Sequence, residues 1–173
     1  MEHSFRPARP DDLEQILNVI ESGRLYLKAQ GLAQWQDGNG PARTDIVSDI
    51  QSGYAYVLTL GGAVLGYACL IPGPDGSPEP SEGGWDPRYD QYAAIHRVAI
   101  GEGGRGRGLS GRLLQEMLAA GWAQGYRDIR IDTHPGNVIM QRVISGVGFT
   151  HIGTLELPIP EGERLAYQIL LED

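Results

Sequence analysis

Apolar residues recur along the chain with two different spacings, one typical of helices and the other of strands. Between residues 11 and 30 they return every three or four positions, which predicts a helix with one buried face, although Gly23 is expected to bend or end it. Residues 54–60 and 63–71 are β-branched and aromatic runs separated by a Gly-Gly pair, a pattern that predicts a β-hairpin.

The rest of the chain continues this mixture around one long loop. Residues 72–90 hold five prolines and four glycines, which exclude a helix or a central strand and predict a loop. The other predicted strands are 3–9, 93–100, 128–133, 148–157 and 164–171, and the other predicted helices are 44–50, 109–124 and 137–145. Thr44 is expected to cap the first of these helices.

Composition and charge narrow the class of protein. The 173 residues, 41% hydrophobic and 21% charged, suit a single domain over residues 1–173. A net charge of −8 argues against a nucleic-acid partner, because nucleic acid requires a basic face. No apolar run has membrane-spanning length and no secretory signal is recognisable, so no membrane partner is expected. The single cysteine, Cys69, lies in an apolar run and is expected to be a buried thiol in a cytoplasmic protein.

The stretch Arg105–Ser110, with the sequence RGRGLS, has the features of an anion site between a predicted strand and a predicted helix. Gly106 and Gly108 let the main chain approach an anion without a Cβ clash. The first amides of the following helix, from Leu109, are unpaired and lie at the positive end of the helix dipole. Arg105 and Arg107 add donors for charge-assisted hydrogen bonds. The loop therefore predicts a phosphate-binding site.

Two other interpretations of this loop stay open at the level of motif. A flexible connector explains the glycines but not the two arginines. A dinucleotide site is the second, because Gly106, Gly108 and Gly111 satisfy G-x-G-x-x-G and Asp132 lies about 20 residues downstream. A dinucleotide-binding domain needs several strand–helix–strand units, however, and only one surrounds the motif.

The chain resembles the GNAT superfamily of acyl-CoA-dependent N-acetyltransferases. Its loop is similar to their signature Q/R-x-x-G-x-G/A, with Arg105, Gly108 and, as a departure, Ser110 in the last position. The order of the predicted elements is similar over nearly the whole chain. The stretches QGLAQWQDG, IHRVAI and RIDTHPGN resemble more narrowly a bacterial subgroup of the superfamily.

The resemblance implies an α/β (α+β) fold and an acyl donor. The fold is a mixed, mostly antiparallel sheet of about seven strands, with a splayed parallel central pair and about four helices. The donor is acetyl-CoA, whose pantetheine arm would lie along the main chain of Val98 and Ile100. Its pyrophosphate would be held by Arg105, Gly106, Arg107, Gly108, Leu109 and Ser110. Asn137 either contacts the pantetheine arm or only caps the next helix.

The implied activity is acetyl transfer to a primary amine of a small molecule or peptide, by direct attack in a ternary complex. His96 is the candidate base, because it titrates near neutrality and alternation places it on the same side of its strand as Val98 and Ile100. Ile144 stands where many members carry a tyrosine that protonates the leaving thiolate. Tyr167 is the substitute candidate for that acid, although a tyrosine on a strand also suits plain packing.

Aromatic residues and one histidine are candidates for the acceptor site. Trp35, Trp85 and Tyr89 lie in predicted loops where aromatic faces can hold an ammonium group, and His134 ends a strand near the splayed pair. No cluster of Cys, His, Asp and Glu has the spacing of a metal site, so no metal is expected. A non-catalytic acyl-CoA sensor and a dinucleotide-binding enzyme are the alternatives, and a homodimer is a possible assembly.

Overall fold

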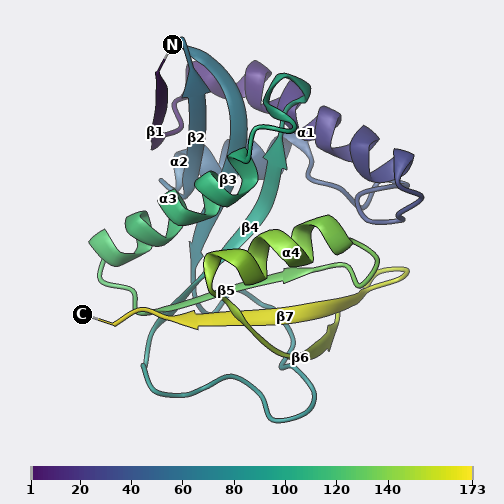
Figure 1. The fold of residues 1–173 in the computed structure, drawn as a ribbon, viewed down its shortest axis with the longest axis vertical. Coiled ribbons are helices and arrows are strands. Elements are labelled where there is room, and N and C mark those ends of the chain that lie inside the picture. Colours follow the sequence, from purple (N-terminus) through teal and green to yellow (C-terminus); the bar gives the residue numbers. More distant parts are fainter. Residues whose placement is uncertain (1, 173) are drawn as a thin grey trace.

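One seven-stranded sheet organises the molecule, and the computed structural model describes residues 2–172 of it. The strands lie in the order β1-β2-β3-β4-β5-β7-β6 (Figure 1). The elements are β1 (His3–Pro7), α1 (Leu13–Ala29), α2 (Arg43–Gln51), β2 (Ala55–Leu60), β3 (Ala63–Pro72), β4 (Tyr92–Ile100), α3 (Leu109–Ala123), β5 (Asp128–Thr133), α4 (Val138–Val147), β6 (Thr150–Glu156) and β7 (Glu163–Leu170), with 3₁₀ turns at Pro10–Asp12 and Glu102–Gly104.

The centre of the sheet is forked. Strands β4 and β5 run parallel and pair only from Tyr92 to Ala94 with Asp128 to Arg130, after which they separate (Figure 1). The other neighbouring strands pair antiparallel. This confirms the mixed, mostly antiparallel sheet with a splayed parallel pair and contradicts a doubly wound dinucleotide fold.

The two faces of the sheet bury different sets of side chains. Helices α3 and α4 cover one face, where Leu113, Met117 and Ile144 are fully buried against Ile129 and its strand neighbours. Helices α1 and α2 cover the β2–β4 part of the opposite face. The loop between β3 and β4 continues that opposite face over β5 and β7, where the Gln168 side chain bonds the main chain of Asp86.

Two helix predictions need correction. Gly23 does not end α1, which continues from Leu13 to Ala29. A Cβ at Gly23 would lie 3.2 Å from the Trp35 ring, so the glycine allows a close approach of that ring to the helix. Thr44 does not cap α2, which begins at Arg43 after Ala42. The Asp45 carboxylate accepts the Ala42 N–H at 2.7 Å instead.

A bulge in β4 changes which way His96 faces. On β3, one residue lies between Tyr67 and Cys69. On β4, two residues lie between their partners Ala99 and His96. Arg97 takes up the extra residue with a left-handed φ of 56°. His96 therefore shares the α1–α2 face with Cys69 and Ala99.

The prediction that His96 faces the same side as Val98 and Ile100 is thus wrong. Val98 and Ile100 pack against the core under α3. The bulge breaks the strict alternation on which the prediction relied. The sequence gives no sign of it, because Arg97 is not a glycine.

An ion pair between β4 and α2 lies at the bulge, with Asp49 buried and Arg97 half-buried. The Arg97 guanidinium donates to both Asp49 carboxylate oxygens, at 2.9 and 2.8 Å, and the fully buried Tyr67 hydroxyl donates to the same carboxylate at 2.6 Å. Burial raises the pKa of Tyr67, so this hydroxyl stays a donor. The Cys69 thiol is buried, as predicted, and burial raises its pKa as well; it lies on the same face of the sheet.

Replacing Asp49 with alanine is expected to destabilise the protein by about 2–4 kcal/mol, because it leaves the half-buried Arg97 charge and the fully buried Tyr67 hydroxyl without their acceptor. Glu14→Ala is the matched control, since its pair with Arg43 is exposed and is worth under about 1 kcal/mol. Urea denaturation measures both changes. Equal losses for the two variants would contradict a structural role of the Asp49–Arg97 pair.

No helix within residues 2–172 combines the length and the apolar character that crossing a membrane requires.

Candidate active site

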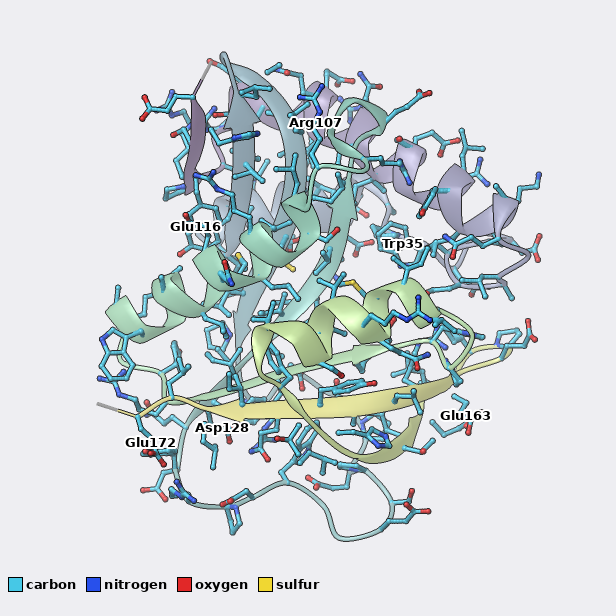
Figure 2. The ribbon with its side chains drawn as sticks, in the orientation of Figure 1. Trp35, Arg107, Glu116, Asp128, Glu163 and Glu172 are labelled. Carbon is cyan, nitrogen blue, oxygen red and sulfur yellow. The ribbon has the colours of Figure 1, made fainter. Side chains whose placement is uncertain are left out.

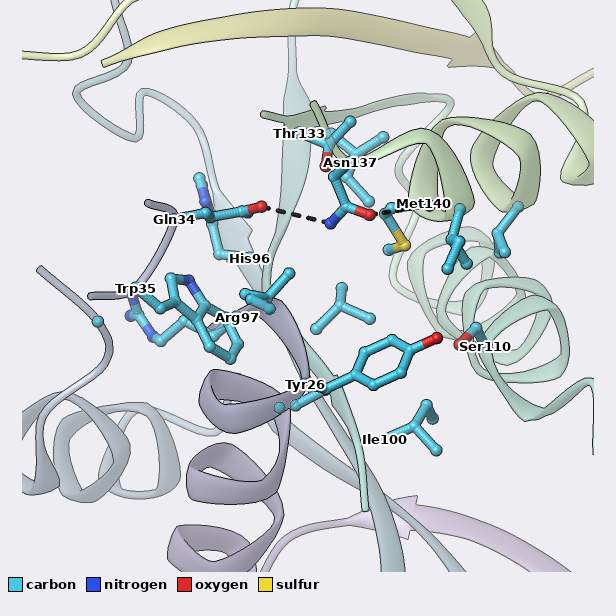
Figure 3. Close-up of a pocket in the computed structure, with 18 of the residues that line it drawn as sticks. Tyr26, Gln34, Trp35, His96, Arg97, Ile100, Ser110, Thr133, Asn137 and Met140 are labelled. Atoms are coloured by element: carbon cyan, nitrogen blue, oxygen red, sulfur yellow. Dashed lines mark hydrogen bonds between the residues drawn. The ribbon is translucent and has the colours of Figure 1, made fainter. Parts of the chain in front are cut away.

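A cavity of about 530 Å³ opens where β4 and β5 separate (Figure 3). The end of β4 and the end of β5 form its two sides. The rest of the wall comes from α1 with the loop after it, the start of α3, the start of α4, and the β6–β7 loop with Arg164 at the start of β7. Of the predicted site residues, the wall contains Trp35, His96, Val98, Ile100, Arg105, Gly106, Gly108, Leu109, Ser110 and Asn137. The fold thus brings most of the predicted cofactor residues to one place.

A row of free amides stands at one end of this cavity. Gly106 and Gly108 adopt left-handed φ values of 74° and 69°, which turn the chain into α3. Within the described part of the chain, the N–H groups from Gly106 to Gly111 have no hydrogen-bond acceptor. A Cβ added at Gly106 or Gly108 would meet no protein atom within 4 Å, so the row faces open space. Such a row with a helix dipole behind it suits a phosphate group.

The two arginines of the loop have different roles. The Arg105 guanidinium donates to the Ser22 carbonyl at 2.8 Å and the Ile100 carbonyl at 3.1 Å, and it stacks 3.9 Å over the Tyr26 ring. The Arg105 Nη2 therefore ties the loop to α1, while the residue still lines the cavity, and its expected role at the phosphate stays a prediction. Arg107 does not line the cavity; its side chain is exposed in the loop ahead of α3 (Figure 2).

The far side of the cavity offers further polar groups to an extended ligand. Asn137 caps α4, because its Oδ1 accepts the Met140 N–H at 3.2 Å while its Nδ2 donates to Gln34 at 3.3 Å (Figure 3). The Thr133 hydroxyl is buried on the wall without a hydrogen-bond partner among the described residues. Beyond Ala94 the edge of β4 that faces β5 has no partner strand within residues 2–172. These features fit an amide-bearing ligand laid between the strands.

His96 is oriented by a carboxylate from the long loop. Its Nε2 lies 2.8 Å from Asp75 Oδ2, and Asp75 also accepts bonds from Tyr92 at 3.0 Å and from Ser77. Burial alone would raise the pKa of Asp75, but these hydrogen bonds, led by that from His96, hold the pKa well below its usual value. An ionised carboxylate only accepts, so Nε2 of His96 carries a proton, and in the neutral ring Nδ1 is the nitrogen that can accept one.

Asp132 lies opposite His96 at the fork. Ala94 and Arg130 are the last paired residues, and His96 and Asp132 each come two positions later on the same face. Burial raises the pKa of the Asp132 carboxyl, and the attraction of nearby cationic groups, Arg164 among them, offsets only part of that rise. Two titratable groups therefore face the point where the strands separate.

Several predicted residues lie away from the cavity. Tyr167 is buried in the core under α3 and α4 with its ring against His151, so the structure does not bring it to the site as a proton donor. Ile144 is fully buried and leaves the family's tyrosine position apolar. His134 closes the turn before α4, where its Nδ1 accepts the Gly136 N–H at 2.9 Å. Tyr89 lines neither this cavity nor the small one beside it.

Trp85 lies next to the site and not in it. Its ring stacks 4.4 Å from the Arg130 guanidinium and lines a small space of about 10 Å³ behind His96 and Asp132. That space is about the size of one water molecule. Trp85 therefore covers the back of the His96–Asp75 pair and does not contact the main cavity.

Sequence reasoning missed Asp75 and Arg164 and gave Asp132 no catalytic role. Asp75 and His96 are 21 positions apart and meet only because the long loop folds back over β4. The one available signal was the strand-end position of Asp132 beside the predicted splay. Within residues 2–172 no group of metal-ligating side chains is close enough to hold an ion.

The separating strands β4 and β5, with unpaired amides at the start of α3 beside them, are typical of acyl-CoA-dependent acyltransferases. Comparison with known proteins agrees. The chain matches the model of the Acetyltransferase (GNAT) family over residues 18–149 and belongs to that family. No curated protein matches the chain.

Solved structures give the same result. A GNAT-family acetyltransferase from Streptococcus agalactiae 2603 is 34% identical, with a TM-score of 0.86 over 99% of this chain and 96% of that one. A GNAT-family acetyltransferase from Listeria monocytogenes 4b F2365 is 22% identical, with a TM-score of 0.73 over 99% and 96%. The yncA protein of Salmonella typhimurium, solved with its cofactor acetyl-CoA, is 18% identical, with a TM-score of 0.71 over 100% and 96%.

Proposed function

We propose that this protein transfers an acetyl group from acetyl-CoA to a primary amine of a small molecule or peptide. The observation that carries the proposal is the row of unpaired amides from Gly106 to Gly111 beside a forked strand pair. The acetyl-CoA held by the related fold of yncA supports the choice of donor.

The donor would be held by main-chain groups more than by charge. The amides from Gly106 to Gly111 suit the pyrophosphate, and the exposed Arg107 side chain can add a charge-assisted bond. The unpaired edge of β4 at Val98 and the buried Thr133 hydroxyl suit the two amides of the pantetheine arm. Acetyl-CoA supplies an acetyl carbon activated by its thioester bond.

His96 is the proposed base. The acceptor nitrogen forms a bond to the acetyl carbon, the carbon–sulfur bond breaks, and its electron pair leaves with sulfur. The Nδ1 of His96 takes the surplus amine proton, directly or through one water, while Asp75 holds the ring and stabilises its charged form. Asp132 lies at the same fork, where its carboxyl can hold the incoming amine.

Direct attack is favoured over an acyl-enzyme route. Cys69 is fully buried on the α1–α2 face, and burial raises the pKa of its thiol, so it is a poor nucleophile. An amine that meets the thioester at the fork needs no covalent carrier. The reaction then passes through one ternary complex.

A non-catalytic acyl-CoA-binding module is the second candidate. It is favoured by Ile144, which leaves the leaving thiolate without the family's usual proton donor. A screen of thiol release from acetyl-CoA with amines, amino acids, polyamines and peptides decides between the two. The proposal expects release that depends on the acceptor. Acetyl-CoA binding without release from any acceptor would favour the binding module.

Replacing Asp75 with asparagine is expected to lower kcat by about 10-fold or more and to leave acetyl-CoA affinity unchanged, because the ring of His96 loses its charged partner. Asp90→Asn is the matched control, an exposed aspartate of the same loop. A positioning role also predicts that the Asp75 change adds little in a His96→Ala background. Additive losses would show that Asp75 does not act through His96.

A further inference from the structure

Arg164, at the start of β7, is a buried cation on the cavity wall. The residue is only 5% exposed, and its Nη1 donates to the Glu161 and Glu163 carbonyls at 2.9 and 2.8 Å. Among residues 2–172 it has no ion-pair partner. Burial lowers the pKa of its guanidinium, although arginine stays charged under ordinary conditions.

Two other inward-facing arginines are paired with carboxylates, whereas Arg105, also on the cavity wall, is held by carbonyl oxygens and the Tyr26 ring. Arg97 bonds Asp49 at 2.8 Å and Arg130 bonds Asp128 at 2.9 Å, and both aspartates are buried. A buried charge without a partner is costly unless a ligand supplies the opposite charge. Arg164 therefore has no carboxylate within ion-pair distance among the described residues, although Asp132 and Glu156 lie near enough to attract its charge.

The strand register places Arg164 on the same face of the sheet as the two proposed site residues, His96 and Asp132. Asp132 pairs with Ala166, and Arg164 lies two positions from Ala166 on the same face of β7. Asp132 and His96 also share that face at the fork. Asp132 and Arg164 are thus diagonal neighbours on the paired strands β5 and β7, about 7–8 Å apart at the main chain, and His96 lies across the fork from Asp132, where β4 and β5 no longer pair.

The position of Arg164 argues against a role in holding the diphosphate of the donor. The amide row follows β4, whereas Arg164 lies beside the end of β5, because Thr133 pairs with Leu165. These ends belong to the two diverging arms of the sheet (Figure 1). The arginine shares its part of the wall with Leu157 and Ile159 of the β6–β7 loop.

We infer that the acceptor is a free α-amino acid or a close analogue, whose carboxylate binds Arg164 while its amine lies between Asp132 and His96. The inference rests on the proposed function and narrows its acceptor. An α-amino acid carries its two charges on one carbon, which matches a cation and a carboxyl on adjacent strands. A peptide N-terminus or a polyamine lacks the anionic group that Arg164 requires.

Matched acceptor pairs test the inference. Thiol release from acetyl-CoA is measured with L-methionine, L-phenylalanine and L-histidine, with the amines that lack their carboxylates, and with their primary amides. The inference expects the best amino acid to exceed its amine and its amide in kcat/KM by at least about 30-fold, as an unpaired buried charge predicts. Equal rates, or faster transfer to the amines, would overturn it and leave the proposed function standing.

Variants of Arg164 test whether this residue causes the preference for acceptors with a carboxylate. Arg164→Gln is expected to remove the preference for the carboxylate while acetyl-CoA affinity stays within about twofold, and Arg164→Lys is expected to keep part of it. A preference that persists in Arg164→Gln contradicts the assignment. Weaker acetyl-CoA binding in both variants would mean that Arg164 serves the donor. Acetyl-CoA binding with no thiol release from any acceptor in the panel would contradict the proposed function and the inference together.

Discussion

Replacement of His96 by alanine is expected to lower kcat by about 100-fold or more while acetyl-CoA affinity changes less than about twofold. A positioned base typically contributes 10² to 10⁴ to a rate. His96 lies at the fork with its Nε2 held by Asp75 at 2.8 Å, so Nδ1 is the ring nitrogen left to accept the amine proton. The rate of thiol release at saturating acetyl-CoA and acceptor gives kcat, and calorimetry gives the affinity for acetyl-CoA.

His151→Ala is the matched control for this change. His151 is exposed on β6 against Tyr167, away from the cavity, and its removal is expected to leave kcat unchanged. If His96→Ala instead weakened acetyl-CoA binding with unaffected turnover, the base assignment would be wrong and His96 would belong to the donor site.

Gly108→Asp is expected to weaken CoA binding by at least about 100-fold. The new carboxylate would project into the open space in front of the amides from Gly106 to Gly111, where the diphosphate is expected. Like charges brought together in a binding site cost several kcal/mol. The left-handed φ of 69° adds a backbone cost of about 1 kcal/mol for any residue with a Cβ.

Gly125→Asp is the control that separates two effects of Gly108→Asp, the negative charge placed at the site and the cost of a left-handed backbone. Gly125 follows α3, has a left-handed φ of 93° and, like Gly108, has open space at its Cβ position. It should lose similar stability in a melting experiment and keep its CoA affinity. Gly108→Ala should fall between wild type and Gly108→Asp. An equal loss of affinity in Gly125→Asp would mean that folding, and not the amide row, is being measured.

Most elements of the fold follow from the sequence because their signals are local. The strand Asp128–Thr133 and the Gly-Gly hairpin are predicted almost to the residue, since β-branched runs end at turn residues. The fork between β4 and β5 has no local signal. It was expected only from the resemblance to the GNAT superfamily, and the register confirms it.

The site is less predictable than the fold because its side chains are set by contacts between distant segments. The loop of Gly106 and Gly108 is recognisable from spacing alone, and the structure gives both glycines left-handed φ values. The bulge at Arg97 places His96 and Val98 on opposite faces of the sheet. Arg97 pairs there with Asp49 of α2, a residue 48 positions earlier in the chain. Arg105 resembles a phosphate ligand in sequence, and nothing in the sequence indicates its additional contacts with α1.

A crystal structure of the protein with bound CoA tests the central claim most directly. The account predicts the diphosphate within hydrogen-bonding distance of the amides from Gly106 to Gly111, and the sulfur between β4 and β5 near His96. A complex in which CoA binds elsewhere, with the gap between these strands closed by side chains and the amide row facing solvent, would contradict it.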